Sequence, residues 1–398
     1  MTNAIILGDV HLGKGTNIGK GGVGSTLNSR IVDQLNLLDW TLDRAVEHQA
    51  DHIIITGDIF EDPKPHPALI TLFIAWLKRC QVHDVIVHLI RGNHDILRSG
   101  QFYTSPLDII TEADIDKVNV YKDIDTIIIG TTAFTFVPYR DRKSFSVGSN
   151  ADAIALVRDS LVYELSSIPD TYRKVLVGHL AIEGSIPVGD KIDDLTNELF
   201  CPLDMFQGYD YVWMGHVHKP QVMQKKNPFI AHIGSMDLSN FGETDHKKHI
   251  VIFNCAEENG WSTENLPTRP LQKITISVPK DTEDTTAYVL KELKKTGIQD
   301  TAIVRVDVSL TSPDLKSVSK SVIEKYLTGH GASNVNAISE SKKVNLIKKD
   351  SNNNIDSKMD VSSAIKTYAQ TYIEDAERAG FIELAMEIHT IHKMEGKE

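Results

Sequence analysis

Short apolar runs alternate with amphipathic stretches over residues 4–261 of the chain. This alternation is typical of the strands and crossover helices of an α/β layered fold. Between the first two runs, apolar residues recur every three or four positions, which predicts a helix over Gln34–His48. The predicted strands of this part are Ala4–Leu7, His52–Thr56, Asp84–Ile90, Lys174–Val177 and Tyr211–Met214.

The order of predicted elements changes after Pro267 and Pro270. The pattern that follows predicts a small α+β domain, with strands at 273–278, 302–310 and 334–339 and helices near 287–295 and 315–327. Residues 350–360 are polar and rich in Asn, which is the composition of a flexible linker. We therefore expect a main domain at 1–265, an α+β domain at 271–347, a linker at 348–360 and a tail at 361–398.

The tail carries apolar residues at helical spacing over Val361–Met394, which predicts one or two helices with a break at Gly380. An amphipathic helix behind a flexible linker either packs on its own body or docks on a partner. The pattern alone leaves both alternatives open.

The composition narrows the class of protein. A length of 398 residues indicates two or three domains, and no stretch approaches the ~18–20 apolar residues of a membrane span. The first residues have no secretion-signal pattern, and three scattered cysteines argue against a disulfide framework, so we expect a cytoplasmic protein. A net charge of −12 excludes a general nucleic-acid coat, so contacts with phosphates must be local or assisted by metals.

Potential metal ligands follow directly after five of the predicted strands, and each group is preceded by a glycine. The carboxyl ends of strands in an open α/β sheet are where ligands bind. Carboxylate, amide and imidazole ligands without a thiolate suit Mn²⁺, Fe²⁺ or Zn²⁺ better than Mg²⁺ or Ca²⁺. These side chains are too many for one ion but suffice for two ions that share a carboxylate. The candidate ligands are Asp9, His11, Asp58, Asn93, His179, His216 and His218.

Each of these groups has a plainer interpretation when it is taken alone. An Asp after a strand is commonly a helix cap, a lone His is commonly a hydrogen-bonded interior residue, and Gly-Asn-His-Asp is also a turn sequence. Their occurrence after five strands in order favours a dinuclear metal site. The segment Gly13–Gly24 does not have the spacing of a phosphate-binding loop, so it is predicted to be a flexible loop beside the site. Lys14 and Lys20 in it are candidates for contacts with substrate phosphates, and a solvated loop is the alternative.

The ordered motifs GDVHLG, GDIFED, GNHD, GHL and GHVHKP resemble those of the calcineurin-like metallophosphoesterase superfamily. Within it, the chain resembles the SbcD and meiotic-recombination-eleven nucleases, which repair DNA double-strand breaks together with an SbcC-type coiled-coil ATPase. Gly234-Ser235 followed by Leu238-Ser239-Asn240-Phe241-Gly242-Glu243 is similar to a segment of these nucleases, with Asn240 as an extra residue. The resemblance implies a sandwich of two sheets flanked by helices, an α+β capping domain and a helical tail that docks on the ATPase.

The resemblance also implies a role for each site residue. One Mn²⁺ would bind Asp9, His11, Asp58 and His218, and a second would bind Asp58, Asn93, His179 and His216, with Mg²⁺, Fe²⁺ or Zn²⁺ as alternative metals. His94 would protonate the leaving oxygen or stabilise the transition state, and Asp95 would orient it. Together with Lys14 and Lys20, Ser235 is a candidate for contacts with the substrate. Glu61 departs from the pattern, because some relatives carry a histidine there.

The expected function is that of a metal-dependent exonuclease and endonuclease acting on DNA ends, as a homodimer that binds an SbcC-type ATPase through residues 361–398. The apolar segment Ala68–Cys80 is the expected dimer contact, and complete burial inside the domain is the alternative. A small-molecule or cyclic-nucleotide phosphodiesterase is the alternative function. A protein phosphatase is disfavoured, because Glu61-Asp62-Pro63 stands where those enzymes carry an arginine. A scaffold without activity is disfavoured as well, because every ligand position holds a competent residue.

Overall fold

The computed structural model describes residues 3–21, 27–99, 102–145, 147–186, 198–256 and 260–342, together with 365–366, 368–370 and 378–386 of the tail. The chain divides into two compact units. The first consists of Met1–Val278, Thr282–Ser309 and Lys316–Ser341, and the second of Pro279–Asp281, Leu310–Leu315 and Lys342–Glu398.

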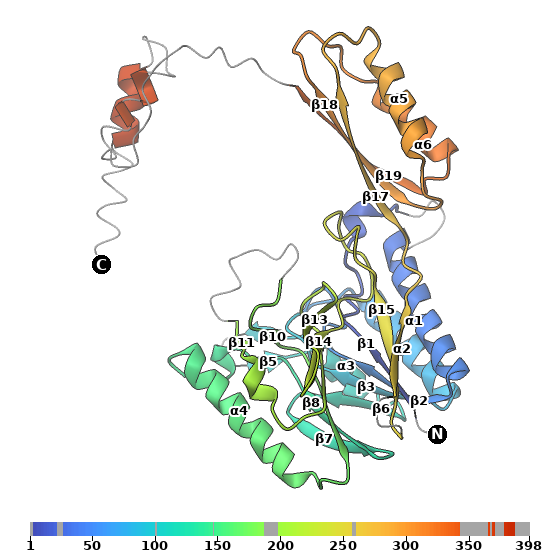
Figure 1. Cartoon of the computed structure of the whole chain (residues 1–398), viewed down its shortest axis with the longest axis vertical. Coiled ribbons are helices and arrows are strands. Elements are labelled where there is room, and N and C mark those ends of the chain that lie inside the picture. The colour runs from blue at the N-terminus through green and yellow to red at the C-terminus, as the bar shows by residue number, and fades with distance from the viewer. Residues whose placement is uncertain are drawn as a thin grey trace. The chain divides into compact units, whose positions relative to one another are not determined.

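The first large sheet of the first unit has the strand order β16-β15-β1-β2-β3-β6 (Figure 1). Strands β1, β2, β3 and β6 pair in parallel, as expected for the α/β pattern, while β15 pairs antiparallel with both β1 and β16. The strands are β1 (Asn3–Leu7), β2 (Ala50–Ile55), β3 (Ile86–Ile90), β6 (Val118–Tyr121), β15 (His249–Asn254) and β16 (Trp261–Asn265).

The second large sheet has the order β13-β14-β12-β9-β8-β7. Its inner strands β14, β12, β9 and β8 are parallel, and the edge strands β13 and β7 are antiparallel to their neighbours. The strands are β7 (Asp125–Ile129), β8 (Thr132–Val137), β9 (Arg173–Gly178), β12 (Tyr211–Met214), β13 (Gln221–Gln224) and β14 (Phe229–His232).

The two sheets pack face to face over a shared hydrophobic core. Ile6 and Ile54 of the first sheet lie in one buried cluster with Phe136, Val177 and Trp213 of the second. The inner residues of the parallel strands are apolar on both faces, because helices cover the outer face of each sheet. The predicted sandwich of two sheets flanked by helices is therefore confirmed.

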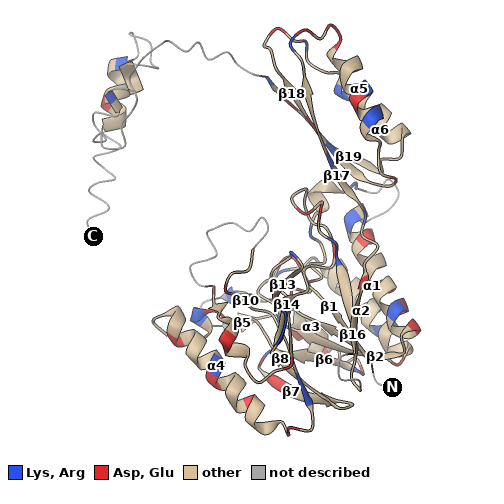
Figure 2. Ribbon diagram, in the orientation of Figure 1, with Lys and Arg blue, Asp and Glu red and all other residues tan. Residues whose placement is uncertain are grey.

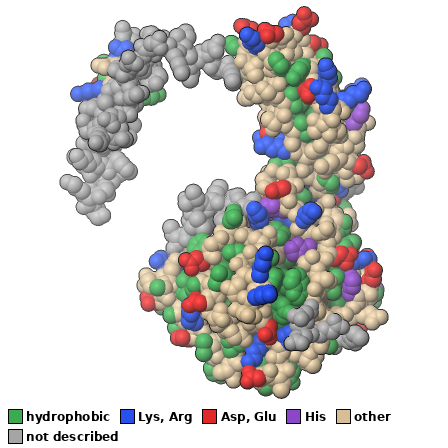
Figure 3. All heavy atoms as spheres, viewed as in Figure 1, with side chains coloured by type: hydrophobic (Ala, Val, Ile, Leu, Met, Phe, Trp, Pro, Cys, Tyr) green, Lys and Arg blue, Asp and Glu red, His purple; other side chains and the backbone are tan. Residues whose placement is uncertain are grey.

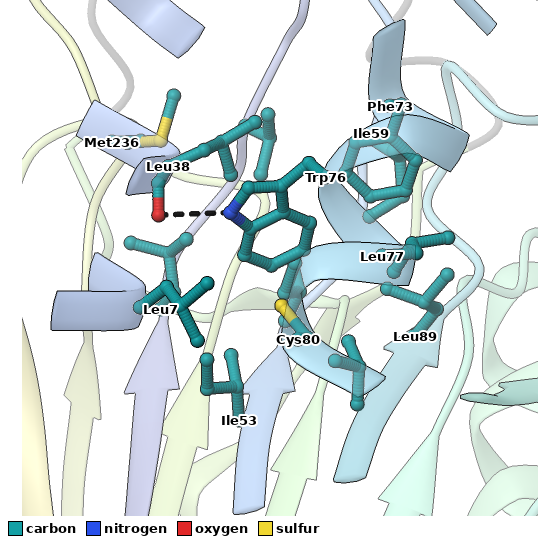
Figure 4. Close-up of a cluster of buried hydrophobic side chains, with 14 of the residues drawn as sticks. Leu7, Leu38, Ile53, Ile59, Phe73, Trp76, Leu77, Cys80, Leu89 and Met236 are labelled. Atoms are coloured by element: carbon teal, nitrogen blue, oxygen red, sulfur yellow. Dashed lines mark hydrogen bonds between the residues drawn. The ribbon is translucent and has the colours of Figure 1, made fainter. Parts of the chain in front are cut away.

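Three helices pack on the outer face of the first sheet, and a fourth packs on the second. Figure 4 shows Trp76 of α2 at the centre of the first of these cores, where its indole nitrogen donates a hydrogen bond of 3.0 Å to the carbonyl of Leu38. The first helix begins at Ser29 rather than at Gln34, because the side chain of Asn28 caps it. The helices are α1 (Ser29–Glu47), α2 (Pro67–Val82), α3 (Pro106–Glu112) and α4 (Asn150–Ser167).

Short elements connect these layers. They are β4 (Leu97–Ser99) paired with β5 (Phe102–Thr104), β10 (Ala181–Ile182) paired with β11 (Phe200–Cys201), and the 3₁₀ turns η1 (Thr16–Ile18), η2 (Arg142–Phe145) and η4 (Leu203–Phe206).

The predicted α+β elements form a sheet of order β17-β18-β19, with α5 in contact with β17 and α6. Buried apolar residues alternate with more exposed polar residues along β17 and β18, which is the pattern of a sheet covered on one face. The second helix begins at Lys320, later than the predicted 315. The elements are β17 (Leu271–Val278), α5 (Thr285–Thr296), β18 (Ile303–Leu310), α6 (Lys320–Gly329) and β19 (Asn334–Lys342).

In the tail, residues 368–370 and 378–386 are helical, and the predicted linker lies outside the described residues. The two segments contact each other through the rings of Tyr368 and Phe381, whose centroids are 5.9 Å apart. Gly380 lies inside the second helical segment, so the predicted break at that glycine is wrong. Among the described helices, none has the length and apolar character needed to cross a membrane.

Candidate metal centre

The candidate ligands lie where β1, β2, β3, β9 and β12 end, and glycines allow the loops after these strands to approach closely. A Cβ on Gly92 would lie 2.1 Å from Oδ1 of Asp58, and a Cβ on Gly215 would lie 2.3 Å from Oδ1 of Asp9. A side chain at either glycine would therefore collide with a candidate ligand. The glycines that precede the ligands in the sequence are required by this packing.

Several candidate ligands have an unusual backbone conformation. The φ angle is 47° at His11, 47° at Asp58 and 75° at His216, all in the left-handed region that non-glycine residues seldom adopt. Such conformations are costly and cluster at functional sites, where the surrounding structure holds them in place. The strain supports a functional role for these side chains.

Asp9, His11 and His218 form the first group, with their candidate ligand atoms all within 4.8 Å of one another. The Nε2 atoms of His11 and His218 face each other at 2.9 Å. Two nitrogens bound to one ion at about 2.1 Å would be about 3 Å apart, so this spacing suits a shared cation. Oδ2 of Asp9 is buried without a hydrogen-bond partner, which also fits a cation at this position.

Asn93, His179 and His216 form the second group. Oδ1 of Asn93 lies 2.9 Å from Nε2 of His179 and 3.0 Å from Nδ1 of His216. Oδ2 of Asp58 lies 3.3 Å from Nε2 of His179 and also 3.3 Å from Nε2 of His11. Asp58 therefore connects the two groups, and the donor set fits two divalent metal ions with one shared carboxylate.

The pKa values of His11 in the first group and His179 in the second are shifted in opposite directions. Burial lowers the pKa of His11 to about 4, which keeps the imidazole in the neutral form that binds metals. Burial also lowers the pKa of His179, but the carboxylates of Asp58 and Asp9 outweigh it and raise the pKa to about 9. A field that favours a proton on His179 also favours a metal cation in its place.

His94 lies at the edge of this cluster, with about 34% of its side chain exposed. Its backbone N–H donates to Oδ1 of Asp58 at 2.9 Å, and its Nδ1 donates to the carbonyl of Glu61 at 2.7 Å. Because Nδ1 is used in this way, Nε2 is the nitrogen that can exchange a proton with a substrate. The ring centroid of His94 is 4.8 Å from that of His11.

Asp95 has different neighbours from those expected. It is fully buried and accepts hydrogen bonds from the backbone N–H groups of Gly92 at 3.0 Å, Ile59 at 3.1 Å and Phe60 at 3.2 Å. Within the described residues, the contact that orients the His94 ring is the Glu61 carbonyl and not Asp95. Asp95 ties the loop that carries Asp58 to the loop that carries Asn93.

The three residues expected to contact the substrate lie in different environments. Nζ of Lys14 is 3.0 Å from Oε2 of Glu61, at the border of the metal centre. Lys20 instead donates to the carbonyl of Ser333 at 2.9 Å. Ser235 is buried and accepts a hydrogen bond of 2.7 Å from Lys248, so its hydroxyl serves an internal contact.

Carboxylates stand behind three of the candidate histidines. Oε2 of Glu61 lies 2.8 Å from Nδ1 of His11, Oε1 of Glu198 lies 3.4 Å from Nε2 of His216, and Oε1 of Glu243 lies 3.8 Å from Nδ1 of His218. A carboxylate on the second ring nitrogen of a metal-binding histidine fixes its tautomer and orientation. The sequence analysis did not assign these roles, although Glu243 lies in the segment that resembles the nucleases.

Burial raises the pKa of Glu61, but the hydrogen bond and charge of His11, followed by the charge of Lys14, outweigh it and lower the pKa to about 2. Glu61 is therefore an acceptor at neutral pH and cannot act as a proton donor. The Glu61 carboxylate instead contacts His11 and Lys14.

Comparison with known proteins identifies the family of the chain. Residues 2–220 match the calcineurin-like phosphoesterase family, and the chain belongs to this family. Among named relatives, it is 24% identical to the D subunit of the nuclease SbcCD of Staphylococcus saprophyticus over 67% of this chain and 69% of the relative. It is 25% identical to the DNA double-strand break repair protein Mre11 of Saccharolobus solfataricus over 71% of this chain and 68% of the relative.

The corresponding SbcCD nuclease chain of Escherichia coli K12 is 22% identical over 61% of this chain and 65% of its own length. Among solved structures, a dimetal phosphatase from Danio rerio matches with a TM-score of 0.41 and 12% identity, covering 66% of this chain and 95% of that one. The chain is thus a phosphoesterase by family, with relatives that are named as nucleases.

Proposed function

We propose that this chain is a nuclease that hydrolyses phosphodiester bonds of DNA with two Mn²⁺ ions. The observation that carries the proposal is the position of Asp58 between two groups of ligands, with the partly exposed His94 beside them. The names of the relatives in the comparison favour DNA over a small-molecule ester as the substrate.

In this proposal Asp9, His11, Asp58 and His218 hold one ion, and Asp58, Asn93, His179 and His216 hold the other. When bound, such ions polarise the phosphate and lower the pKa of a bound water. His94 supplies a proton from Nε2 to the leaving oxygen, because its Nδ1–H is held by the Glu61 carbonyl. A carboxylate beside the second ring nitrogen holds three of these rings in their orientation. The pairs are Glu61 with His11, Glu198 with His216 and Glu243 with His218.

The negative net charge does not oppose a DNA substrate. Acidic and basic residues are interspersed along α1, α4 and α5 in Figure 2, and on the face seen in Figure 3 basic side chains lie beside histidines. Two divalent ions would add positive charge where the phosphate binds. Lys14 borders that position and is the lysine that we propose contacts it.

We further propose that residues 361–398 dock on an SbcC-type coiled-coil ATPase and that α2 contributes to a homodimer. The name of the Staphylococcus saprophyticus relative supports the first proposal. Leu384 and Tyr368 of the tail are 58% and 44% exposed, so the described part presents apolar surface. Leu72 on α2 is partly exposed while Phe73 and Trp76 beside it are buried, which supports a second apolar face on that helix.

Hydrolysis of linear duplex DNA and of bis-p-nitrophenyl phosphate, each with and without Mn²⁺, tests the activity. We expect cleavage of both substrates by the wild-type chain and of neither by Asp58→Asn, because a shared ligand serves both ions. Asp43→Asn, an exposed carboxylate on α1, is the matched control and keeps both activities. Hydrolysis of the small ester without cleavage of DNA would instead support the small-molecule phosphodiesterase.

A further inference from the structure

A polar pocket of about 410 Å³ lies next to the loop that backs the metal centre. This volume is within the range of small-ligand sites, which run from about 300 to 1,000 Å³. Its walls come from the η1 turn, the loop after the last candidate ligand, and the strands of the α+β domain, all within the first unit. The residues that the argument uses are Asn240, Phe241, Lys273, Arg305 and Asn336.

One loop connects this pocket to the metal centre. Ser239 donates a hydrogen bond of 2.5 Å to Oε1 of Glu243, and Asn240 donates one of 2.8 Å to the same oxygen. That oxygen also lies 3.8 Å from Nδ1 of His218. The loop therefore lines the pocket with one part and supports a candidate metal ligand with another.

Asn240 is the extra residue in the segment of this chain that resembles the nucleases. Its side-chain oxygen accepts a hydrogen bond of 2.7 Å from the N–H of Gly242, so the loop closes around the extra residue. Phe241 follows it, is partly buried against Ile18 and Leu238, and is one of the residues that line the pocket.

The charged residues that line this pocket are both basic. Arg305 pairs through Nε with Asp307 at 2.9 Å, and Nζ of Lys273 is 3.6 Å from the same carboxylate. Their side chains remain 39% and 48% exposed. Two cations share one carboxylate here, so the pocket keeps a positive charge in a chain whose net charge is −12.

We propose that this pocket binds one nucleotide unit, with the phosphate on Lys273 and Arg305, the base on the Phe241 ring, and the Asn336 amide as a further polar contact. A cationic pair beside an aromatic face is how proteins hold single-stranded nucleic acid without sequence preference. The proposal rests on the proposed function in one respect, because a DNA strand that reaches the metal centre would supply the nucleotide. A free mononucleotide has the same chemistry.

Binding of a fluorescein-labelled single-stranded DNA octamer to the metal-free full chain, followed by anisotropy at several salt concentrations, tests this inference. We expect Phe241→Leu to weaken binding about tenfold, since one base stack contributes roughly this much. Lys273→Gln and Arg305→Gln should each reduce the slope of log K against log salt by about 0.7. Lys291→Gln, an exposed lysine on α5, is the matched control and should bind like the wild type.

Deletion of Asn240 should weaken octamer binding as Phe241→Leu does, because it withdraws the ring from the pocket. Deoxyadenosine monophosphate added as a competitor distinguishes the two sources of the nucleotide: displacement supports a mononucleotide site, and no displacement supports a site for a strand. Melting temperatures establish that each variant is folded. Folded Phe241→Leu and Lys273→Gln proteins that bind the octamer like the wild type would overturn the inference.

The two proposals fail separately. If the chain does not cleave DNA but octamer binding depends on Phe241 and Lys273, the pocket stands and the nuclease proposal fails. If it cleaves DNA and the variants bind normally, the nuclease proposal stands and the pocket fails.

Discussion

The ammonium group of Lys248 is buried behind the metal centre, and its removal should be severely destabilising. The residue is 1% exposed, and its Nζ lies 2.9 Å from the carbonyl of His218, 2.7 Å from Oγ of Ser235 and 2.8 Å from Oε2 of Glu243. Lys248→Met retains most of the apolar stem but removes all three donors. The fully buried carboxylate of Glu243 then loses its counter-charge.

Breaking a buried ion pair from one side costs about 3–5 kcal/mol, because the remaining charge stays buried without a partner. The carbonyl of His218 and the hydroxyl of Ser235 also lose a donor, which places the expected cost of Lys248→Met in the upper part of that range. Lys248→Met combined with Glu243→Gln removes the uncompensated charge. We therefore expect the double variant to be more stable than Lys248→Met, by about 1–3 kcal/mol.

The free energy of unfolding is measured by urea titration of the metal-free chain, with tryptophan fluorescence as the signal. Lys247→Met is the matched control, because Lys247 is exposed and next in the sequence, and its cost should stay within about 0.5 kcal/mol. A cost below about 1 kcal/mol for Lys248→Met, or a double variant no more stable than the single one, would refute the reasoning. Mn²⁺ affinity should also fall about tenfold or more, since the carbonyl that Lys248 holds belongs to His218.

Three other perturbations have expected outcomes. His94→Ala should retain two bound Mn²⁺ ions but cleave DNA about 10²–10⁴ times more slowly, and calorimetric loss of an ion would contradict its role as a proton donor. Burial and then the charge of His52 lower the pKa of His88 from 6.5 to about 3, so the folded state stays unprotonated where the unfolded chain binds a proton. The contribution of His88 to the free energy of unfolding is therefore fully present above about pH 6.5 and is lost as the pH falls toward 3. Between pH 7.5 and 5, urea unfolding of His88→Phe should show a loss about 2 kcal/mol smaller than that of the wild type. Removal of residues 351–398 should abolish binding to an SbcC-type ATPase in a pull-down while Mn²⁺-dependent cleavage of short DNA ends persists; unchanged ATPase binding would contradict the docking proposal.

The candidate ligands could be identified from the sequence because they depend on local features. Each follows an apolar strand and a glycine, and within each of the two sheets the ends of the parallel strands meet at one edge. Gly92 shows why the signal is present at all, since a Cβ there would lie 2.1 Å from Oδ1 of Asp58. The close packing of the centre thus requires glycine in these turns, and the glycines can be recognised in the sequence.

The residues that support the candidate ligands cannot be recognised from the sequence in this way. Glu198 lies just before the short strand β11 and contacts His216 just after β12, and neither periodicity nor spacing predicts that contact. Lys248 follows directly after the exposed Lys247, and nothing in the sequence distinguishes the two, but the fold buries Lys248. Asp95 follows His94 directly, but its side chain turns to the backbone of Ile59 and Phe60, and adjacency in the sequence does not indicate that direction.

The charges around the centre explain why these supporting residues are acidic. Seven charged groups either belong to the candidate ligand set or join it through an ion pair. With the imidazoles neutral, as metal binding requires, five carboxylates give −5 and two ammonium groups give +2, so the sum is −3 before the charge of the metals is added. Two divalent ions add +4, so the sum of the charges becomes +1. A positive sum attracts a phosphate diester, which is an anion. The buried carboxylates therefore both orient the imidazoles and favour cations over an empty site. The groups in this sum are Asp9, Asp58, Glu61, Glu198, Glu243, Lys14 and Lys248.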